Sequence, residues 1–176
     1  MAWLPNKKIV IIGGTTGIGL SAALAFVQQG AQLVVVGRNP DSCKQAATLL
    51  GTNAKTLSGD ATQPHLAQAA IDLCLETYGD FNGLYHVAGG SGRKWGDGPL
   101  HELSLDGWNK TFELNLTSLM LSNQAAIKTF LARGTEGVIL NMGSVLGQSP
   151  SIPYFTTHAY AAAKAAVTGF IKATAA

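Results

Sequence analysis

Short apolar runs alternate along the chain with longer stretches whose apolar residues recur at helical spacing. Runs rich in β-branched residues are typical of strands buried on both faces of a sheet, and the longer stretches are typical of amphipathic helices. Strands are expected at residues 9–12, 31–36, 54–58, 83–87 and 137–142. Helices are expected between them and from His158 onward. The alternation predicts an α/β domain with a parallel sheet.

The first strand leads into a glycine-rich turn, Gly-Gly-Thr-Thr-Gly-Ile-Gly over residues 13–19, and then into a helical pattern that ends at Gly30, a typical C-cap. Glycine permits backbone angles that a Cβ forbids and lets a phosphate approach the main chain closely. The helix N-terminus offers unpaired N–H groups to that phosphate. An ordinary tight turn is the alternative, but the βαβ context favours a dinucleotide site. Its residues are Gly13, Thr15, Thr16, Gly17, Ile18 and Gly19.

The end of the second strand indicates which dinucleotide is bound. An NAD site has an acidic residue about 20 residues past the glycine turn, where it binds the ribose 2′-hydroxyl. Here that position holds Gly37, and Arg38 comes next. A guanidinium can bind a 2′-phosphate through two hydrogen bonds. NADP is therefore favoured over NAD, with a solvated loop arginine as the alternative explanation of Arg38.

Tyr160 and Lys164 are four residues apart in the last helical pattern, so they share one helix face. A tyrosine, with a reference pKa of about 10, is a poor acid or base near neutrality, and a nearby positive charge favours phenolate. Ser144 comes shortly after the last apolar run. A surface lysine beside a packed tyrosine is the alternative, but the serine and the glycine turn favour a catalytic group.

The glycine spacing at 13–19, together with Ser144, Tyr160 and Lys164, resembles the short-chain dehydrogenase/reductase family, in particular its NADP-preferring, 3-oxoacyl-reductase-like branch. The resemblance extends over nearly all of the chain. It implies a Rossmann-type doubly wound parallel sheet of order 3-2-1-4-5 with helices on both faces. We expect a single dinucleotide-binding domain over residues 1–176.

The resemblance also implies catalytic roles. Tyr160 would exchange a proton with a carbonyl or alcohol oxygen as hydride moves, and Ser144 would hydrogen-bond that oxygen. Lys164 would favour the ionised form of Tyr160, and both residues would bind the nicotinamide ribose. Asn115 is a polar amide among apolar helix residues, and would position a water in a proton relay. A hydrogen bond to local backbone is the structural alternative for Asn115.

Further cofactor contacts are implied at two strand ends, by Asp60, Ala61, Ala88 and Gly89. Asp60 would contact the adenine amino group; the alternative is that Asp60 or Thr62 starts the helix expected at 64–78, and both roles can hold together. Where the family has Asn-Asn-Ala-Gly, this chain has His86 and Val87 in place of both asparagines. His86 could take over the bracing of the central sheet, whereas Val87 cannot. A satisfied core histidine is the favoured interpretation of His86.

Composition excludes other classes of protein. The chain has 176 residues, of which 47% are hydrophobic and 12% charged, with a net charge of +2. That charge argues against nucleic acid or an anionic membrane as partner, and no apolar run approaches the ~18 residues of a membrane span. Cys43 and Cys74 lack metal-ligand spacing, so no metal is expected, and reduced cysteines fit a cytoplasmic protein.

The expected function is NADP-dependent hydride transfer between nicotinamide and a carbonyl or secondary alcohol. A non-catalytic NADP-binding or scaffold protein and a sugar-nucleotide epimerase-like enzyme are the alternatives. The chain stops inside a helical pattern, where family members continue into further strands, so a C-terminally truncated domain is expected. A homodimer or homotetramer is expected by resemblance only. Residues 152–155 are apolar, which fits the mouth of a substrate cleft and core packing equally well.

Overall fold

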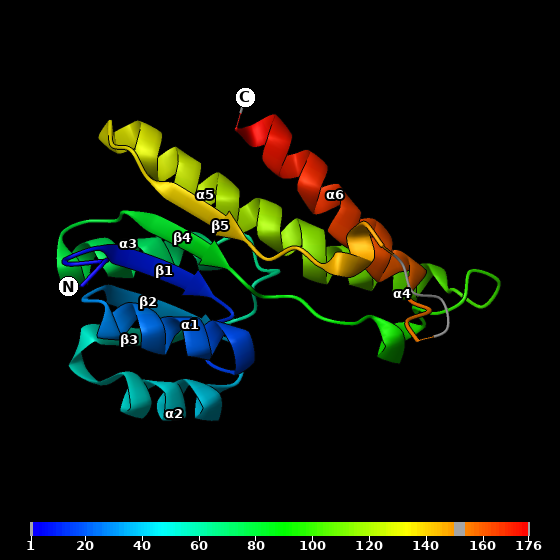
Figure 1. The fold of residues 1–176 in the computed structure, drawn as a ribbon, viewed down its shortest axis with the longest axis horizontal. Helices are drawn as coiled ribbons and strands as arrows, with labels where there is room; N and C mark the ends of the chain where they lie inside the picture. Colours follow the sequence, from blue (N-terminus) through cyan, green and yellow to red (C-terminus); the bar gives the residue numbers. More distant parts are fainter. Residues whose placement is uncertain (1, 150–153, 176) are drawn as a thin grey trace. The chain divides into compact units, whose positions relative to one another are not determined.

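The strands and helices of the computed structural model, which describes residues 2–149 and 154–175, lie where the hydrophobic pattern predicts them (Figure 1). The first part of the chain contains β1 (Lys8–Ile12), α1 (Gly17–Gln28), β2 (Gln32–Gly37), α2 (Pro40–Leu50), η1 (Gly51–Asn53), β3 (Ala54–Ser58), α3 (Leu66–Tyr78) and β4 (Gly83–His86). The remainder contains η2 (Arg93–Trp95), α4 (Leu105–Phe112), η3 (Glu113–Thr117), α5 (Ser118–Arg133), β5 (Val138–Asn141), η4 (Val145–Gly147) and α6 (His158–Thr174).

These elements form two compact units. The first unit runs to Ala88 and adds Leu119–Leu140, so it contains the sheet, α1 to α3 and nearly all of α5. The second unit comprises Gly89–Ser118 and the chain from Asn141 onward. It contains α4, η3, η4 and α6, and α6 packs against the other three.

The sheet of the first unit has the strand order β3-β2-β1-β4-β5, which confirms the predicted 3-2-1-4-5 order. The central strand β1 pairs in parallel with β2 and with β4, and β2 pairs in parallel with β3. Since the order reverses beside β1, the carboxyl ends of β1 and β4 flank the switch point where α/β proteins bind ligands.

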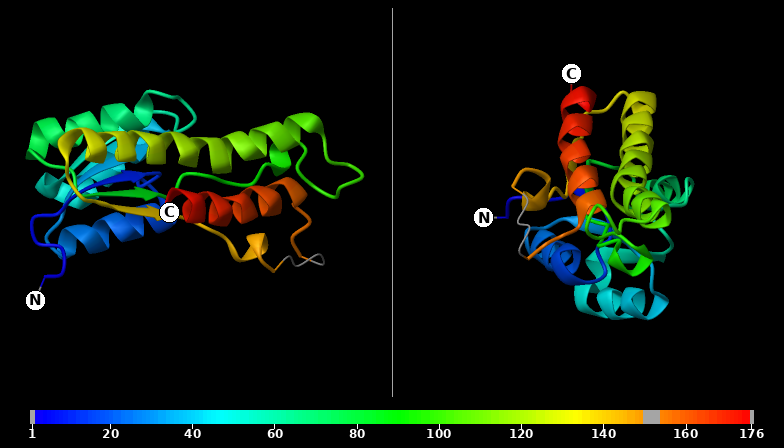
Figure 2. Two further views of the ribbon diagram at one scale, coloured as in Figure 1. Left: turned by 90° about the horizontal axis from the view of Figure 1, so that it is seen from above. Right: turned by 90° about the vertical axis from the view of Figure 1, so that its right-hand side faces the viewer.

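Helices cover both faces of this sheet, with α3 and α5 on one face and α1 on the other (Figure 2). Phe81, just before β4, stacks on Phe130 of α5, with ring centroids 4.8 Å apart. On the opposite face, the ring of Phe26 in α1 lies 6.3 Å from that of Tyr85 in β4. The core on the α3 and α5 side also includes Val10, Ile12, Val34, Val36, Leu66, Ala70, Ile71, Cys74, Leu84 and Ala126. Nearly continuous apolar strands are thus explained by burial on both faces.

Local signals set several helix ends, among them the end predicted at Gly30. Gly30 follows α1 with a φ of +89°, a conformation that glycine adopts without steric cost. The Ser104 side chain caps α4 by accepting a hydrogen bond from the Gly107 N–H at 2.9 Å. Asn39 does the same for α2, where it accepts from Asp41 and Ser42.

Candidate active site and dinucleotide turn

The glycine turn between β1 and α1 has the geometry of a phosphate cradle. Gly13 has a φ of +90°, and a Cβ added there would lie 2.6 Å from the Ala88 nitrogen. Gly17 has a φ of +51° and faces open space. Thr16, the N-cap of α1, makes no side-chain capping bond, and the first turn holds no acidic residue. The N–H groups at this helix end therefore remain suited to an anionic ligand.

Arg38 lies directly beyond the carboxyl end of β2 and is exposed. A side chain at the preceding position is excluded, because a Cβ on Gly37 would collide with the buried side chain of Thr15. An acidic residue at position 37 would therefore require this part of the turn to move. The charge available at this strand end is that of Arg38.

Asp60 follows β3 and makes a local turn rather than starting a helix. Its Oδ1 accepts hydrogen bonds from the N–H and the hydroxyl of Thr62, at 3.0 and 2.9 Å. Helix α3 begins later, at Leu66, and its N-cap is His65 without a capping bond. The alternative in which Asp60 or Thr62 starts this helix is therefore wrong, because the helix begins at Leu66 and neither residue is its N-cap. Ala61 packs at the margin of the core.

His86, which the resemblance places at the position of an asparagine, is fully buried at the end of β4. Its Nε2 donates to the Ala88 carbonyl at 3.1 Å, and its Nδ1 lies 2.7 Å from the Ser122 hydroxyl of α5. The Ala88 N–H in turn donates to the carbonyl of Ile12, the last residue of β1. The ring therefore connects the end of β4 to α5, which agrees with the expected core histidine.

In the second unit, Tyr160 and Lys164 lie one turn apart on α6, as their spacing predicts. The Lys164 ammonium lies 5.8 Å from the centroid of the Tyr160 ring, within cation–π range. It also donates a 2.8 Å hydrogen bond to the Met142 carbonyl, just after β5. Burial lowers the pKa of Lys164, because desolvation disfavours its charged form.

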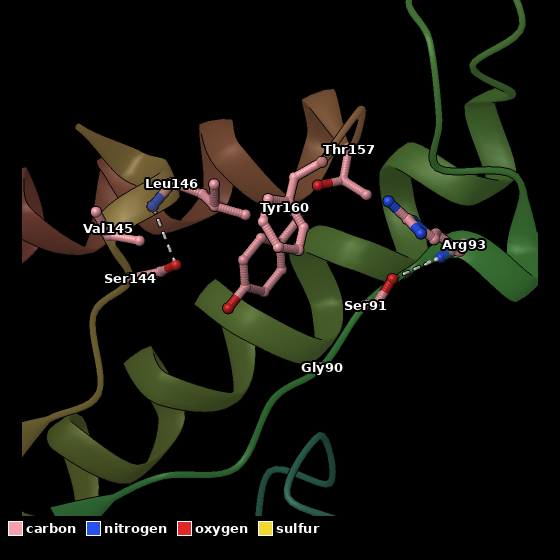
Figure 3. A pocket seen from close by; sticks show the side chains of 9 residues that line it. Gly90, Ser91, Arg93, Ser144, Val145, Leu146, Thr157 and Tyr160 are labelled. Carbon is pink, nitrogen blue, oxygen red and sulfur yellow. Dashed lines mark hydrogen bonds between the residues drawn. The ribbon is translucent and has the colours of Figure 1, made fainter. Parts of the chain in front are cut away.

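Ser144 and Tyr160 line the same pocket, which has a volume of about 490 Å³ (Figure 3). The Ser144 Oγ accepts a 3.2 Å hydrogen bond from the Leu146 N–H, while the Tyr160 hydroxyl points toward the side of the pocket that Ser144 occupies. Two hydroxyl groups thus face one cavity, from the N-cap of η4 and from α6. The other residues that line it are Gly90, Ser91, Arg93, Val145, Leu146, Phe155 and Thr157.

Asn115 is completely buried in η3, a π-helical turn. Its amide binds both main-chain groups of Gly90: it accepts from the N–H at 3.1 Å and donates to the carbonyl at 2.8 Å. It also donates to the Thr111 carbonyl at 2.9 Å. These bonds are the hydrogen bonds to backbone that the structural alternative for Asn115 predicts, and they fix the position of the segment after β4. A role in a water relay stays a prediction.

Asp97 is a positioning residue that the sequence analysis missed. It is buried, and its carboxylate accepts hydrogen bonds from the N–H groups of Ala159 and Tyr160, at 3.0 and 3.1 Å. A negative charge at the start of α6 is also favourable for the helix dipole. No local signal identifies this contact, since the two partners are 62 and 63 residues away.

The predicted site residues divide between the two units. Asn115, Ser144, Tyr160 and Lys164 belong to the second unit, together with Gly89. The glycine turn, Arg38, Asp60, Ala61 and Ala88 belong to the first. Of the apolar residues at 152–155, Ile152 and Pro153 lie outside the described residues, Tyr154 is exposed and Phe155 lines the pocket.

Two features, a membrane-spanning helix and a metal-binding cluster, are absent from residues 2–149 and 154–175. None of their helices combines the length and the apolarity that crossing a bilayer requires. These residues also contain no group of three or more His, Cys, Asp or Glu side chains arranged to hold a metal ion.

Comparison with known proteins identifies the family. The family described as short chain dehydrogenase matches residues 7–176. A 2-(S)-hydroxypropyl-CoM dehydrogenase of Xanthobacter autotrophicus is 34% identical over 93% of this chain and 62% of its own length. Cyclohexanol dehydrogenase of Acinetobacter sp. is 31% identical over 97% of this chain and 66% of its own. The chain thus spans under two thirds of the length of these relatives.

The fold agrees with this assignment. The crystal structure of a short chain dehydrogenase from Bacillus anthracis superposes with a TM-score of 0.84 at 26% identity, covering 94% of this chain and 65% of that one. The strand order fits the fold expected for this family, and the family match covers nearly the whole chain. The chain therefore belongs to the short-chain dehydrogenase family.

Proposed function

We propose that the protein is an NADP-dependent oxidoreductase that transfers a hydride between nicotinamide and a carbonyl or secondary alcohol. The observation that carries the proposal is the pocket lined by Ser144 and Tyr160, with the Lys164 ammonium against the Tyr160 ring. The relatives named above are dehydrogenases of alcohols, as their names state, which supports the same reaction class.

In the proposed reduction, the side chains of the second unit handle the proton and the developing charge. The Tyr160 hydroxyl donates a proton to the carbonyl oxygen, and the Ser144 hydroxyl hydrogen-bonds the same oxygen as its charge develops. The reduced nicotinamide, when bound, supplies the hydride that the carbonyl carbon accepts, so the product is a secondary alcohol. The ammonium of Lys164 stabilises the tyrosinate that remains until solvent returns its proton.

The first unit fits the cofactor that this reaction requires. Gly13 and Gly17 leave room beside the main chain, and the N-terminus of α1 is not capped by a side chain. We assign the pyrophosphate to this turn and the ribose 2′-phosphate to Arg38, with Asp60 and Ala61 toward the adenine and Ala88 and Gly89 toward the nicotinamide ribose.

Replacing Tyr160 by phenylalanine tests the reaction. Tyr160→Phe should bind NADPH as the wild type does and lose about 10²- to 10⁴-fold in kcat, the usual contribution of a positioned acid. NADPH oxidation with a panel of ketones measures kcat, and NADPH fluorescence measures binding. Tyr154→Phe is the matched control, because this tyrosine is exposed. Wild-type kcat in Tyr160→Phe would refute the assignment, and NADPH binding without turnover by the wild type would favour a non-catalytic binding protein.

Arg38→Asp tests the cofactor preference. The change replaces a cation that suits a 2′-phosphate with a carboxylate that suits a 2′-hydroxyl, so preference should move from NADP toward NAD. The ratio of the two dissociation constants, measured by fluorescence titration, is the readout. Lys44→Asp controls for net charge, because this lysine is exposed and pairs with Asp41 of its own helix. An unchanged ratio in Arg38→Asp would contradict the proposed role.

We also propose that the protein is cytoplasmic, forms a single dinucleotide-binding domain and assembles as a homodimer or homotetramer. Light scattering on the protein as it elutes from a size-exclusion column measures its mass, and a monomer at micromolar concentration would refute the proposed assembly.

A further inference from the structure

The pocket beside Tyr160 contains a cation that the proposed reaction does not use. We propose that the pocket takes carbonyl or alcohol substrates that carry an acidic group (a carboxylate, sulfonate or phosphate), and that Arg93 binds this group. The inference rests on the proposed function, because it names the substrate class of the same site. The acidic group itself takes no part in proton or hydride transfer.

The pocket has distinct chemical regions. Ser144 and Tyr160 offer hydroxyl groups, while Val145, Leu146 and Phe155 offer apolar surface. Among the described residues that line the pocket, Arg93 is the one charged residue. The volume of the pocket, about 490 Å³, is in the range of small-molecule sites, roughly 300–1,000 Å³. A ligand that satisfies all three regions therefore has a reacting oxygen, an apolar body and a negative charge.

The guanidinium of Arg93 has no carboxylate partner among the described residues. The pairs of acidic and basic side chains found there have Lys44, His101, Lys110 and Arg133 as their basic members. Asp97, the acidic residue nearest to Arg93 in the sequence, is already bound to two N–H groups of α6. Arg93 is bonded through its main chain, where its N–H donates to the Ser91 hydroxyl at 3.2 Å. Its planar donor fork therefore remains suited to an acidic group.

The loop that carries Arg93 is held in position relative to Tyr160. The Asp97 N–H donates to the Gly92 carbonyl at 3.2 Å, which closes the loop around η2. The Asp97 carboxylate then binds the main chain of Tyr160. In Figure 3 the guanidinium extends from the loop toward Thr157, another residue of the pocket. The main chain beside Arg93 and the main chain of Tyr160 are thus linked through Asp97.

Substrates that differ only in charge test the inference. The probes are 3-oxobutanoate, 4-oxopentanoate, 5-oxohexanoate and 3-oxobutane-1-sulfonate, with the methyl ester of each carboxylate as the neutral counterpart. The wild type should have a higher kcat/KM for at least one oxo acid than for its ester. Arg93→Ala should lower kcat/KM for that acid about 10- to 100-fold, mainly through KM, and leave the ester within about 3-fold. Arg93→Lys should retain part of the preference, because it keeps the charge and loses the fork.

Lys94→Ala is the matched control. It removes the same charge from the neighbouring position, but Lys94 lies over the Trp95 ring at 4.1 Å and does not line the pocket. A second readout is calorimetric binding of 4-hydroxypentanoate without cofactor, which should be lost in Arg93→Ala and kept in Lys94→Ala.

Each outcome supports or overturns the inference. Equal losses of kcat/KM in Arg93→Ala and Lys94→Ala would show that the effect comes from net charge. Equal kcat/KM values of the wild type for each acid and its ester would show that it has no preference for the acid. Either result overturns the inference and leaves the proposed function intact. If the wild type reduces none of the probes, the proposed function fails for them, and the calorimetric comparison still decides whether Arg93 binds the acid.

Discussion

Replacing Gly13 by alanine should destabilise the fold, because the turn is closed against the end of β4. At a φ of +90°, an L-residue carries a strain of about 1–3 kcal/mol. The new Cβ would also lie 2.6 Å from the Ala88 nitrogen and 2.8 Å from its Cα, well inside contact distance. Ala88 must therefore move, although its N–H donates to the Ile12 carbonyl at 2.9 Å. Weakening that hydrogen bond adds about 0.5–1.5 kcal/mol.

The expected loss for Gly13→Ala is thus about 1.5–4.5 kcal/mol of the free energy of unfolding, or roughly 3–18 °C in Tm for a domain of this size. Urea denaturation followed by circular dichroism measures this loss. Gly17→Ala is the matched control, since its φ of +51° is left-handed but no atom lies within 4 Å of the added Cβ. The control should lose only about 1–2 kcal/mol. Equal losses in the two variants would refute the argument that contact with Ala88 restricts position 13.

Two further predictions concern buried acidic groups. Asp97→Ala leaves two N–H groups at the start of α6 without their partner, so we expect a loss of about 2–3 kcal/mol in the free energy of unfolding and a lower kcat. Urea denaturation measures the first and ketone reduction the second. Asp106→Ala is the control at an exposed position, and equal values in the two variants would contradict the prediction. Burial, and secondly the charge of Asp80, raises the pKa of Cys74 from 9.0 to about 12, so above pH 9 the unfolded thiol ionises while the folded thiol stays neutral. Stability should therefore fall by about 1 kcal/mol between pH 8 and 10 from this group, and urea midpoints that fall equally in Cys74→Ala would contradict the prediction.

Much of the fold could be predicted from the sequence, because the relevant signals are local. Four β-branched residues in a row predict a buried strand, a helical period predicts a covering helix, and Gly30 and Ser104 mark helix ends by their own chemistry. The boundaries moved by a residue or two, as at β4, which ends at His86, and at α3, which begins at Leu66. Tyr160 and Lys164 could be paired in advance, because a spacing of four fixes their neighbourhood on any helix.

The sequence by itself therefore determined the order of strands and helices, the glycine turn and the Tyr160–Lys164 pair. Only the tertiary structure decided that His86 binds Ser122, that Asn115 holds Gly90, and that Asp97 holds the start of α6. It also brought Arg93 into the pocket that Ser144 and Tyr160 line. The physical reason is sequence separation: these hydrogen-bonded partners are 25 to 63 residues apart, so they meet only through the packing of whole elements, which no local period or cap encodes.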